Sequence, residues 1–135
     1  MSPGRILVVD DDGSILRLVA TILRRELYDV DMASSGRDAL AKIELTPYDV
    51  IVLDLMMPHV SGFDVLRSLQ VRLPQVKCVV IMSAASSFES ASSHSNVFAA
   101  LRKPFDNHEL ISAVRNCIDS RCGPAHPLHP ITAAA

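Results

Sequence analysis

The chain has 135 residues, of which 49% are hydrophobic and 21% charged, as expected for one soluble globular domain with a hydrophobic core. The formal net charge of −2 provides no electrostatic basis for binding nucleic acid or a membrane surface. No apolar run approaches the ~20 residues needed to span a bilayer.

The start of the chain and its cysteines bear on the cellular compartment. Ile6 to Val9 follow almost directly on the first residue, without the pattern of a signal peptide. Cys78, Cys117 and Cys122 are odd in number and lack metal-ligand spacing, so we expect three reduced thiols and no disulfide framework. Both features predict a cytoplasmic protein.

Apolar runs alternate with amphipathic stretches in the first half of the chain. A strand over 5–9 leads into the acidic run Asp10 to Asp12, and a helix over 14–26 follows. A weaker strand over 30–33 is followed by a helix for which Ser35 is the expected N-cap. Units of strand and helix of about 25 residues are typical of βαβ crossovers and a parallel sheet.

The second half of the chain continues this alternation. Val50 to Leu53 are all apolar, which predicts a strand buried on both faces, and the strand ends at Asp54. Pro58 then prevents an immediate helix. Two more strands are expected over 76–82 and 97–101, and three more helices: one opening at Gly62, a short one over 86–95, and one following the capping-box pair Asp106 and Glu109.

The last fifteen residues differ in composition from the rest. Residues 121–135 are rich in Gly, Pro, His and Ala without periodicity, which predicts a flexible tail or linker after a domain spanning 1–120. We expect His126 and His129 in this tail, and His59 in a loop, to be solvated rather than to bind metal or catalyse a reaction.

Polar residues fall at the ends of the predicted strands. Asp10 to Asp12 follow the first strand, Asp54 the third, Ser83 the fourth and Lys103 the fifth. The carboxyl ends of parallel strands meet at one sheet edge, so these groups should converge. Carboxylates suit Mg²⁺ or Mn²⁺, although an acidic helix start is an alternative for the run at 10–12. The set suits phosphoryl transfer to Asp54, with the metal, the Ser83 hydroxyl and Lys103 each holding a phosphoryl oxygen.

Four motifs in this order resemble the receiver domain of response regulators in two-component signalling. The resemblance covers about 4–120 and implies an α/β fold: a doubly wound, flavodoxin-like, five-stranded parallel sheet in order 2-1-3-4-5, flanked by five helices. The motifs are Ile6-Leu7-Val8-Val9-Asp10-Asp11-Asp12, Asp54-Leu55-Met56-Met57-Pro58 with Gly62 after it, Met82-Ser83-Ala84, and Lys103-Pro104-Phe105.

The resemblance also implies roles for individual residues. Asp54 would be the phosphoacceptor, supplied by a sensor histidine kinase or a histidine phosphotransfer protein. Asp11, Asp54 and the Met56 main-chain carbonyl would bind Mg²⁺ directly, with Mn²⁺ as a substitute, and Asp10 would act largely through water. Asp12 occupies a position that is often acidic without being a ligand.

The chain departs from the family pattern at several positions. Ala100 stands where many members carry an aromatic switch residue, and Phe98, two residues earlier, should lie on the same sheet face. Asn96 replaces a glycine, and its tolerance of the left-handed conformation would preserve the turn. Met56 and Ala85 occupy positions that tune hydrolysis of the acyl phosphate. Neither can orient water by hydrogen bonding, so we expect a long-lived phosphoryl group.

Three functions compete for this pattern. A switch would phosphorylate itself from a donor with Mg²⁺, dephosphorylate slowly, and act on a downstream protein target rather than on nucleic acid or membrane. An aspartyl-phosphate phosphatase or phosphotransferase usually needs a second aspartate where Met56 stands. A receiver-like interaction module would act independently of phosphorylation. We favour the switch, and leave open whether the chain is a single-domain regulator or a piece of a longer protein.

Overall fold

The computed structural model describes residues 3–74, 76, 78–84 and 94–122 of the chain. Five strands form one parallel sheet in the order β2-β1-β3-β4-β5, which confirms the predicted topology. The strands are β1 (Arg5–Val9), β2 (Asp29–Ala33), β3 (Val50–Asp54), β4 (Val79–Ser83) and β5 (Val97–Arg102).

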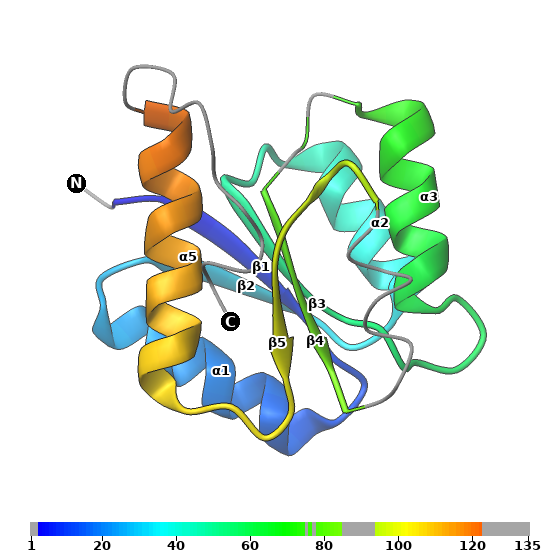
Figure 1. Ribbon diagram of the computed structural model, residues 1–135. Helices are drawn as coiled ribbons and strands as arrows, with labels where there is room; N and C mark the ends of the chain where they lie inside the picture. Colours follow the sequence, from blue (N-terminus) through cyan, green and yellow to red (C-terminus); the bar gives the residue numbers. More distant parts are fainter. Residues whose placement is uncertain (1–2, 75, 77, 85–93, 123–135) are drawn as a thin grey trace.

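Helices cover both faces of this sheet (Figure 1), with α1 and α5 on one face and α2 and α3 on the other. Their bounds are α1 (Gly13–Arg25), α2 (Gly36–Leu45), α3 (Gly62–Arg72) and α5 (Asn107–Cys122). Of the five predicted helices, the one expected over 86–95 lies largely outside the described residues, as does the tail from 123 onward. None of the helices described is long and apolar enough to cross a bilayer.

The central strands are buried on both faces, as their unbroken apolar sequences predict. Alternate residues of β1 divide between two hydrophobic cores: Ile6 and Val8 pack beneath α1 and α5, and Leu7 and Val9 beneath α2 and α3. Every residue of β3 and β4 is buried. The carboxyl ends of these strands are therefore held rigidly at one sheet edge.

Side-chain hydrogen bonds cap the N-termini of α2 and α5 at the residues that the sequence predicts. Ser35 caps α2 by accepting from the Asp38 amide, as expected. Asp106 and Glu109 bond reciprocally before α5, with the Glu109 amide 2.8 Å from Asp106 Oδ1, which confirms the expected capping box. Ser61 forms a further capping box at α3.

The expectation for Phe98 is wrong, because β5 contains a bulge. Val79 pairs with Val97 but Val80 pairs with Ala99, so one extra residue is inserted at Phe98. Phe98 consequently packs against the core beneath α1 and α5, whereas Ala100 belongs to the core beneath α2 and α3. The ring does not lie on the face that Ala100 occupies.

Asn96 also differs from its prediction. Among the described non-glycine residues only Leu27 and His59 have positive φ, so Asn96 does not adopt the left-handed conformation. Its side chain is buried, and its amide donates to the Leu66 carbonyl at 3.3 Å. Asn96 therefore connects the start of β5 to α3 through its side chain.

The structure corrects the prediction of three reduced thiols, since Cys78 and Cys117 form a disulfide. Their Cα atoms are 5.8 Å apart although 39 positions separate them in sequence. The fold produces this proximity by laying α5 across the residue that precedes β4. The spacing of the cysteines along the sequence does not indicate such a contact.

Candidate functional site

Asp54 ends the central strand β3, and its carboxyl group is buried, with only 3% of the residue exposed. Its Oδ1 accepts a hydrogen bond from the Met56 amide at 3.2 Å. The start of α3 packs against the same turn, where the Gly62 amide donates to the Leu55 carbonyl at 3.1 Å. Backbone contacts of the residues that follow Asp54 in sequence thus set the position of its carboxyl group.

Two further carboxylates lie beside Asp54. Asp10 and Asp11 follow β1, the neighbouring strand, and each of the three residues offers a carboxylate oxygen within 4.8 Å of the others. Asp10 is fully buried, whereas Asp11 is exposed and opens the cluster to solvent. A group of oxygen donors of this kind suits a hard divalent cation such as Mg²⁺ or Mn²⁺.

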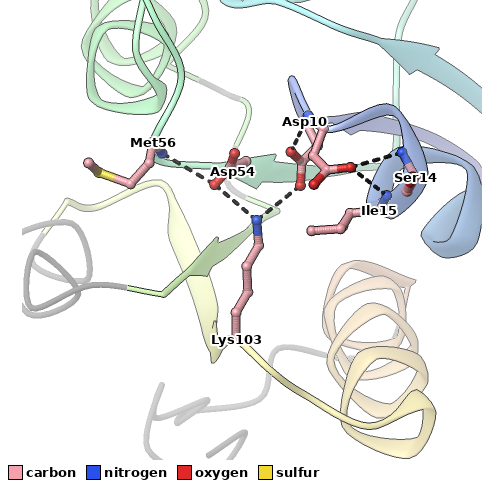
Figure 2. Close-up of polar contacts among 7 residues, drawn as sticks. Asp10, Ser14, Ile15, Asp54, Met56 and Lys103 are labelled. Carbon is pink, nitrogen blue, oxygen red and sulfur yellow. Dashed lines mark hydrogen bonds and ion pairs between the residues drawn. The ribbon is translucent and has the colours of Figure 1, made fainter.

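Asp12, the third residue of the acidic run, caps a helix and is not part of the cluster. Asp12 is the N-cap of α1, and its Oδ1 accepts from the Ser14 and Ile15 amides at 2.9 and 3.2 Å. Figure 2 labels Ser14 and Ile15, the two residues at the start of α1 whose amides make these contacts. The two interpretations of the acidic run therefore apply to different residues: Asp12 starts a helix, and Asp10 and Asp11 belong to the cluster.

Lys103 provides the positive charge of the site. Its Nζ lies 3.1 Å from Asp10 Oδ2 and 3.3 Å from Asp54 Oδ1, between the two carboxylates (Figure 2). The Lys103 amide donates to the Ser83 carbonyl at 2.9 Å, which ties the end of β5 to the end of β4. A cis peptide bond, which we did not predict, joins Lys103 to Pro104. A Lys-Pro pair is the sequence signal that could have suggested it.

When no metal is present, the surroundings of Asp54 shift its carboxyl group toward the protonated form. Burial raises the pKa of Asp54 to about 6, and the neighbouring Asp10 charge adds to this, while Lys103 and the Met56 amide oppose it. Burial by itself would lower the pKa of Lys103, but its contacts with Asp10 and Asp54 raise it overall. Lys103 therefore remains charged beside the carboxylates.

The remaining predicted site residues lie around this cluster. Ser83 is buried at the end of β4, one position beyond Met82, which pairs with Asp54. The Met56 side chain is 56% exposed at the rim. His59 is exposed in the loop before α3, as expected. Ala85 lies outside the described residues. The structure thus gathers Asp10, Asp11 and Asp54, with Lys103 in contact with Asp10 and Asp54, and Ser83 and Met56 adjoining them.

Comparison with known proteins agrees with this geometry. A family model described as "Response regulator receiver domain" matches residues 6–115. Response regulator ArlR of Staphylococcus saprophyticus is 34% identical over 113 residues, covering 82% of this chain and 50% of that protein. Transcriptional regulatory protein ResD of Bacillus subtilis is 36% identical over 118 residues, covering 82% and 46%. The chain spans about half the length of these curated relatives.

Two solved structures show the same likeness over nearly all of their length. The receiver domain of a Francisella response regulator has a TM-score of 0.78 and 33% identity, over 87% of this chain and 98% of that one. Response regulator TrrA of Thermotoga maritima, solved in complex with Mg(2+)-BeF, has a TM-score of 0.77 and 32% identity, over 87% and 99%. Receiver domains are signalling proteins rather than conventional enzymes. The fold, the acidic cluster and these relatives together show that the chain belongs to the response regulator receiver domains of two-component systems.

Proposed function

We propose that the chain is a phosphorylation-dependent switch that accepts a phosphoryl group on Asp54 from a sensor histidine kinase or a histidine phosphotransfer protein. One observation carries the proposal: a buried carboxylate at the end of the central strand lies in contact with a lysine and within 4.8 Å of two further carboxylates. No ordinary structural role requires three carboxylates in such proximity, because their mutual repulsion is unfavourable.

The charge of the site fits a divalent cation. When all groups are ionised, the three carboxylates and the one ammonium leave a net charge of −2. Asp11, Asp54 and the Met56 carbonyl would hold Mg²⁺ directly, with Asp10 acting largely through water and Mn²⁺ as a substitute. A bound Mg²⁺ would neutralise charge on the phosphoryl oxygens and keep Asp54 ionised.

Asp54 then acts as the nucleophile. One carboxylate oxygen attacks the phosphorus atom in line, forming an O–P bond as the P–N bond to the donor histidine breaks, and the imidazole that leaves takes up a proton. Lys103, already placed between Asp10 and Asp54, neutralises charge on the transferred group. The Ser83 hydroxyl, at the end of the adjacent strand, donates to a phosphoryl oxygen.

Phosphorylation of Asp54 changes the contacts of Lys103, and this change links the phosphoryl transfer to the binding of a downstream protein. Transfer adds negative charge beside Asp54, and Lys103 Nζ exchanges its contacts with Asp10 and Asp54 for the phosphoryl oxygens. Lys103 follows β5 and precedes α5, so the change is passed to the elements that would bind a downstream protein in the cytoplasm. Self-phosphorylation and slow dephosphorylation would be the only reactions.

A second function, an interaction module independent of phosphorylation, is favoured by the structure of β5. Ala100 and the bulge at Phe98 leave no aromatic side chain from this strand on the face of α2 and α3. Such a module would keep the fold and the acidic cluster without transferring a phosphoryl group.

Intact-mass measurement after incubation with acetyl phosphate distinguishes the two. The switch predicts a single phosphoryl adduct that requires Mg²⁺ and is absent from Asp54→Asn. Asp29→Asn, which changes an exposed aspartate at the start of β2, the strand end remote from the site, is the matched control and should form the adduct normally. No adduct on folded wild-type protein would reject the switch in favour of the interaction module.

A further inference from the structure

A surface pocket of about 310 Å³ lies where α2 ends and β3 begins, at the sheet edge opposite Asp54. Residues between α3 and β4 complete its wall. Much of the wall is apolar and includes Leu45, Tyr48, Leu73 and Val76. Leu45 is 85% exposed. The pocket therefore presents apolar surface that the phosphorylation site does not use.

The last turn of α5 lies beside this pocket, although α5 covers the other face of the sheet. A Cβ on Gly4 would lie 3.0 Å from Ile118 Cδ1 and 3.4 Å from Asp49 Oδ2. Asp49 is part of the pocket wall, and its Oδ2 accepts from the Arg5 amide at 2.7 Å. Figure 1 shows α5 and α3 ending at the same edge of the sheet. The chain that follows Cys122 therefore starts close to the pocket.

The sequence of the tail from 123 onward has a period of its own. It lacks the periods of helices and strands, but a proline stands at every third position over part of its length. These prolines are Pro124, Pro127 and Pro130. A polyproline II helix has three residues per turn, so residues three apart share a face. Leu128 and Ile131 share one face in this conformation, and His126 and His129 share another.

We propose that residues 125–131 form a polyproline II segment that docks in this pocket of the same molecule. Leu128 and Ile131 lie against the apolar wall and cover Leu45. Proline-rich segments bind in this way to grooves lined by aromatic side chains, and Tyr48 supplies an aromatic ring here. The inference is independent of the phosphorylation of Asp54 and would survive its failure.

The length of the connection permits this docking. The six residues from Cys122 to Leu128 span up to about 19 Å at a rise of about 3.1 Å per residue. The pocket wall is already adjacent to Ile118, one helical turn before Cys122. A short tether also gives the segment a millimolar effective concentration, so weak apolar contacts suffice to hold it.

The charges of the two surfaces also suit each other. Glu44 and Asp49 contribute carboxylates to the wall, and no basic side chain is among the described residues that line it. Glu44 pairs with Arg72, so Asp49 is the carboxylate that meets the tail. The tail contains no acidic residue. Its histidine face, His126 and His129, lies at the open side of the pocket beside Asp49.

The test measures amide order parameters of the tail by ¹⁵N relaxation on the whole chain. Wild type should give values of about 0.8 at Leu128, His129 and Ile131. Leu45→Asp places a charge on the pocket wall at an exposed position, so the values should fall below about 0.6. Leu18→Asp, at an exposed position of α1 on the other face of the sheet, is the matched control and should leave them unchanged.

Other results would overturn the proposal. Wild-type order parameters below about 0.6 would show that the tail is free and the pocket open to a different occupant. High values that Leu45→Asp does not lower would place the tail elsewhere on the molecule. The rotational correlation time of a dimer, or order that is lost on dilution, would show that the tail docks in a second copy of the chain.

Discussion

Asp54 is a carboxyl group whose ionised form is disfavoured by its buried position in the folded protein. Its pKa in the fold, about 6, exceeds its ordinary value of 3.8 because the group is buried beside Asp10. Protonated Asp54 is therefore favoured by folding. Its contribution to stability is fully present below about pH 4 and is lost as the pH rises through about 6.

Asp54→Asn should reveal this pH dependence in metal-free protein. The amide cannot ionise, so the stability of the variant relative to wild type should increase by about 1 kcal/mol between about pH 5 and about pH 8. Urea unfolding at the two pH values, in the presence of a chelator, measures the difference. Asp29→Asn, at an exposed position, should show no such increase; a constant difference for both variants would contradict the raised pKa of Asp54.

Met56 is the residue that we expect to set the lifetime of the phosphoryl group. Its side chain is 56% exposed at the rim of the site and offers no donor or acceptor to orient an attacking water. Met56→Asn supplies an amide at that position, so we expect dephosphorylation to be severalfold faster than in wild type. Decay of the intact-mass adduct after removal of the donor measures both rates. A wild type that decays as fast as the variant, or faster, would contradict the expectation.

At the scale of elements, the contact between α3 and β3 holds the Asp54 turn in place. A Cβ on Gly62 would lie 2.4 Å from the Asp54 carbonyl oxygen and 2.6 Å from Leu55 Cα, which are backbone atoms that cannot move aside alone. The first residue of α3 must therefore lack a side chain for the helix to approach this closely.

Gly62→Ala should accordingly destabilise the fold by about 2 kcal/mol and slow phosphorylation, because the turn after β3 must shift. Gly13→Ala is the matched control at the start of α1. There the added Cβ meets only the flexible end of Arg17, at 3.2 Å, so stability should change little. Urea denaturation of both variants tests the comparison, and equal stability of Gly62→Ala and wild type would show that the helix accommodates the methyl group.

The order of elements could be predicted from local pattern, whereas irregularities in pairing could not. Unbroken apolar runs such as Val50 to Leu53 identify buried strands, and Ser35 and Asp106 identify helix starts. The bulge at Phe98 depends on how β5 registers with β4, which no property of the β5 sequence determines. A prediction that assumed a regular pleat therefore assigned Phe98 to the wrong face.

At the scale of the whole molecule, the parallel topology itself assembles the site. Asp10, Asp54 and Lys103 are far apart in sequence, yet each lies at the carboxyl end of a strand, and these ends share one sheet edge. Their convergence was predictable for this reason. The Cys78–Cys117 disulfide was not, because it joins a strand start to the middle of a helix across the face of the sheet, and no general rule places those positions together.

Mg²⁺ should stabilise the folded molecule as a whole, since the cluster exists only when β1 and β3 are paired. Millimolar Mg²⁺ or Mn²⁺ should raise the melting temperature by a few degrees, through binding to the native state alone. Asp11→Asn should abolish most of the rise. Asp12→Asn should retain it, because asparagine also caps helices and residue 12 lies outside the cluster. An equal loss in both variants would contradict the assignment of the metal ligands.

Mapping the phosphoryl group to a residue tests the proposed switch most directly. Borohydride reduces an acyl phosphate to an alcohol, so a phosphorylated aspartate becomes homoserine and can be located by peptide mass spectrometry. After treatment with acetyl phosphate and Mg²⁺, homoserine should appear at position 54 and disappear when Mg²⁺ is chelated beforehand. Homoserine at position 10 or 11 instead, or at no position in folded protein, would contradict Asp54 as the phosphoacceptor.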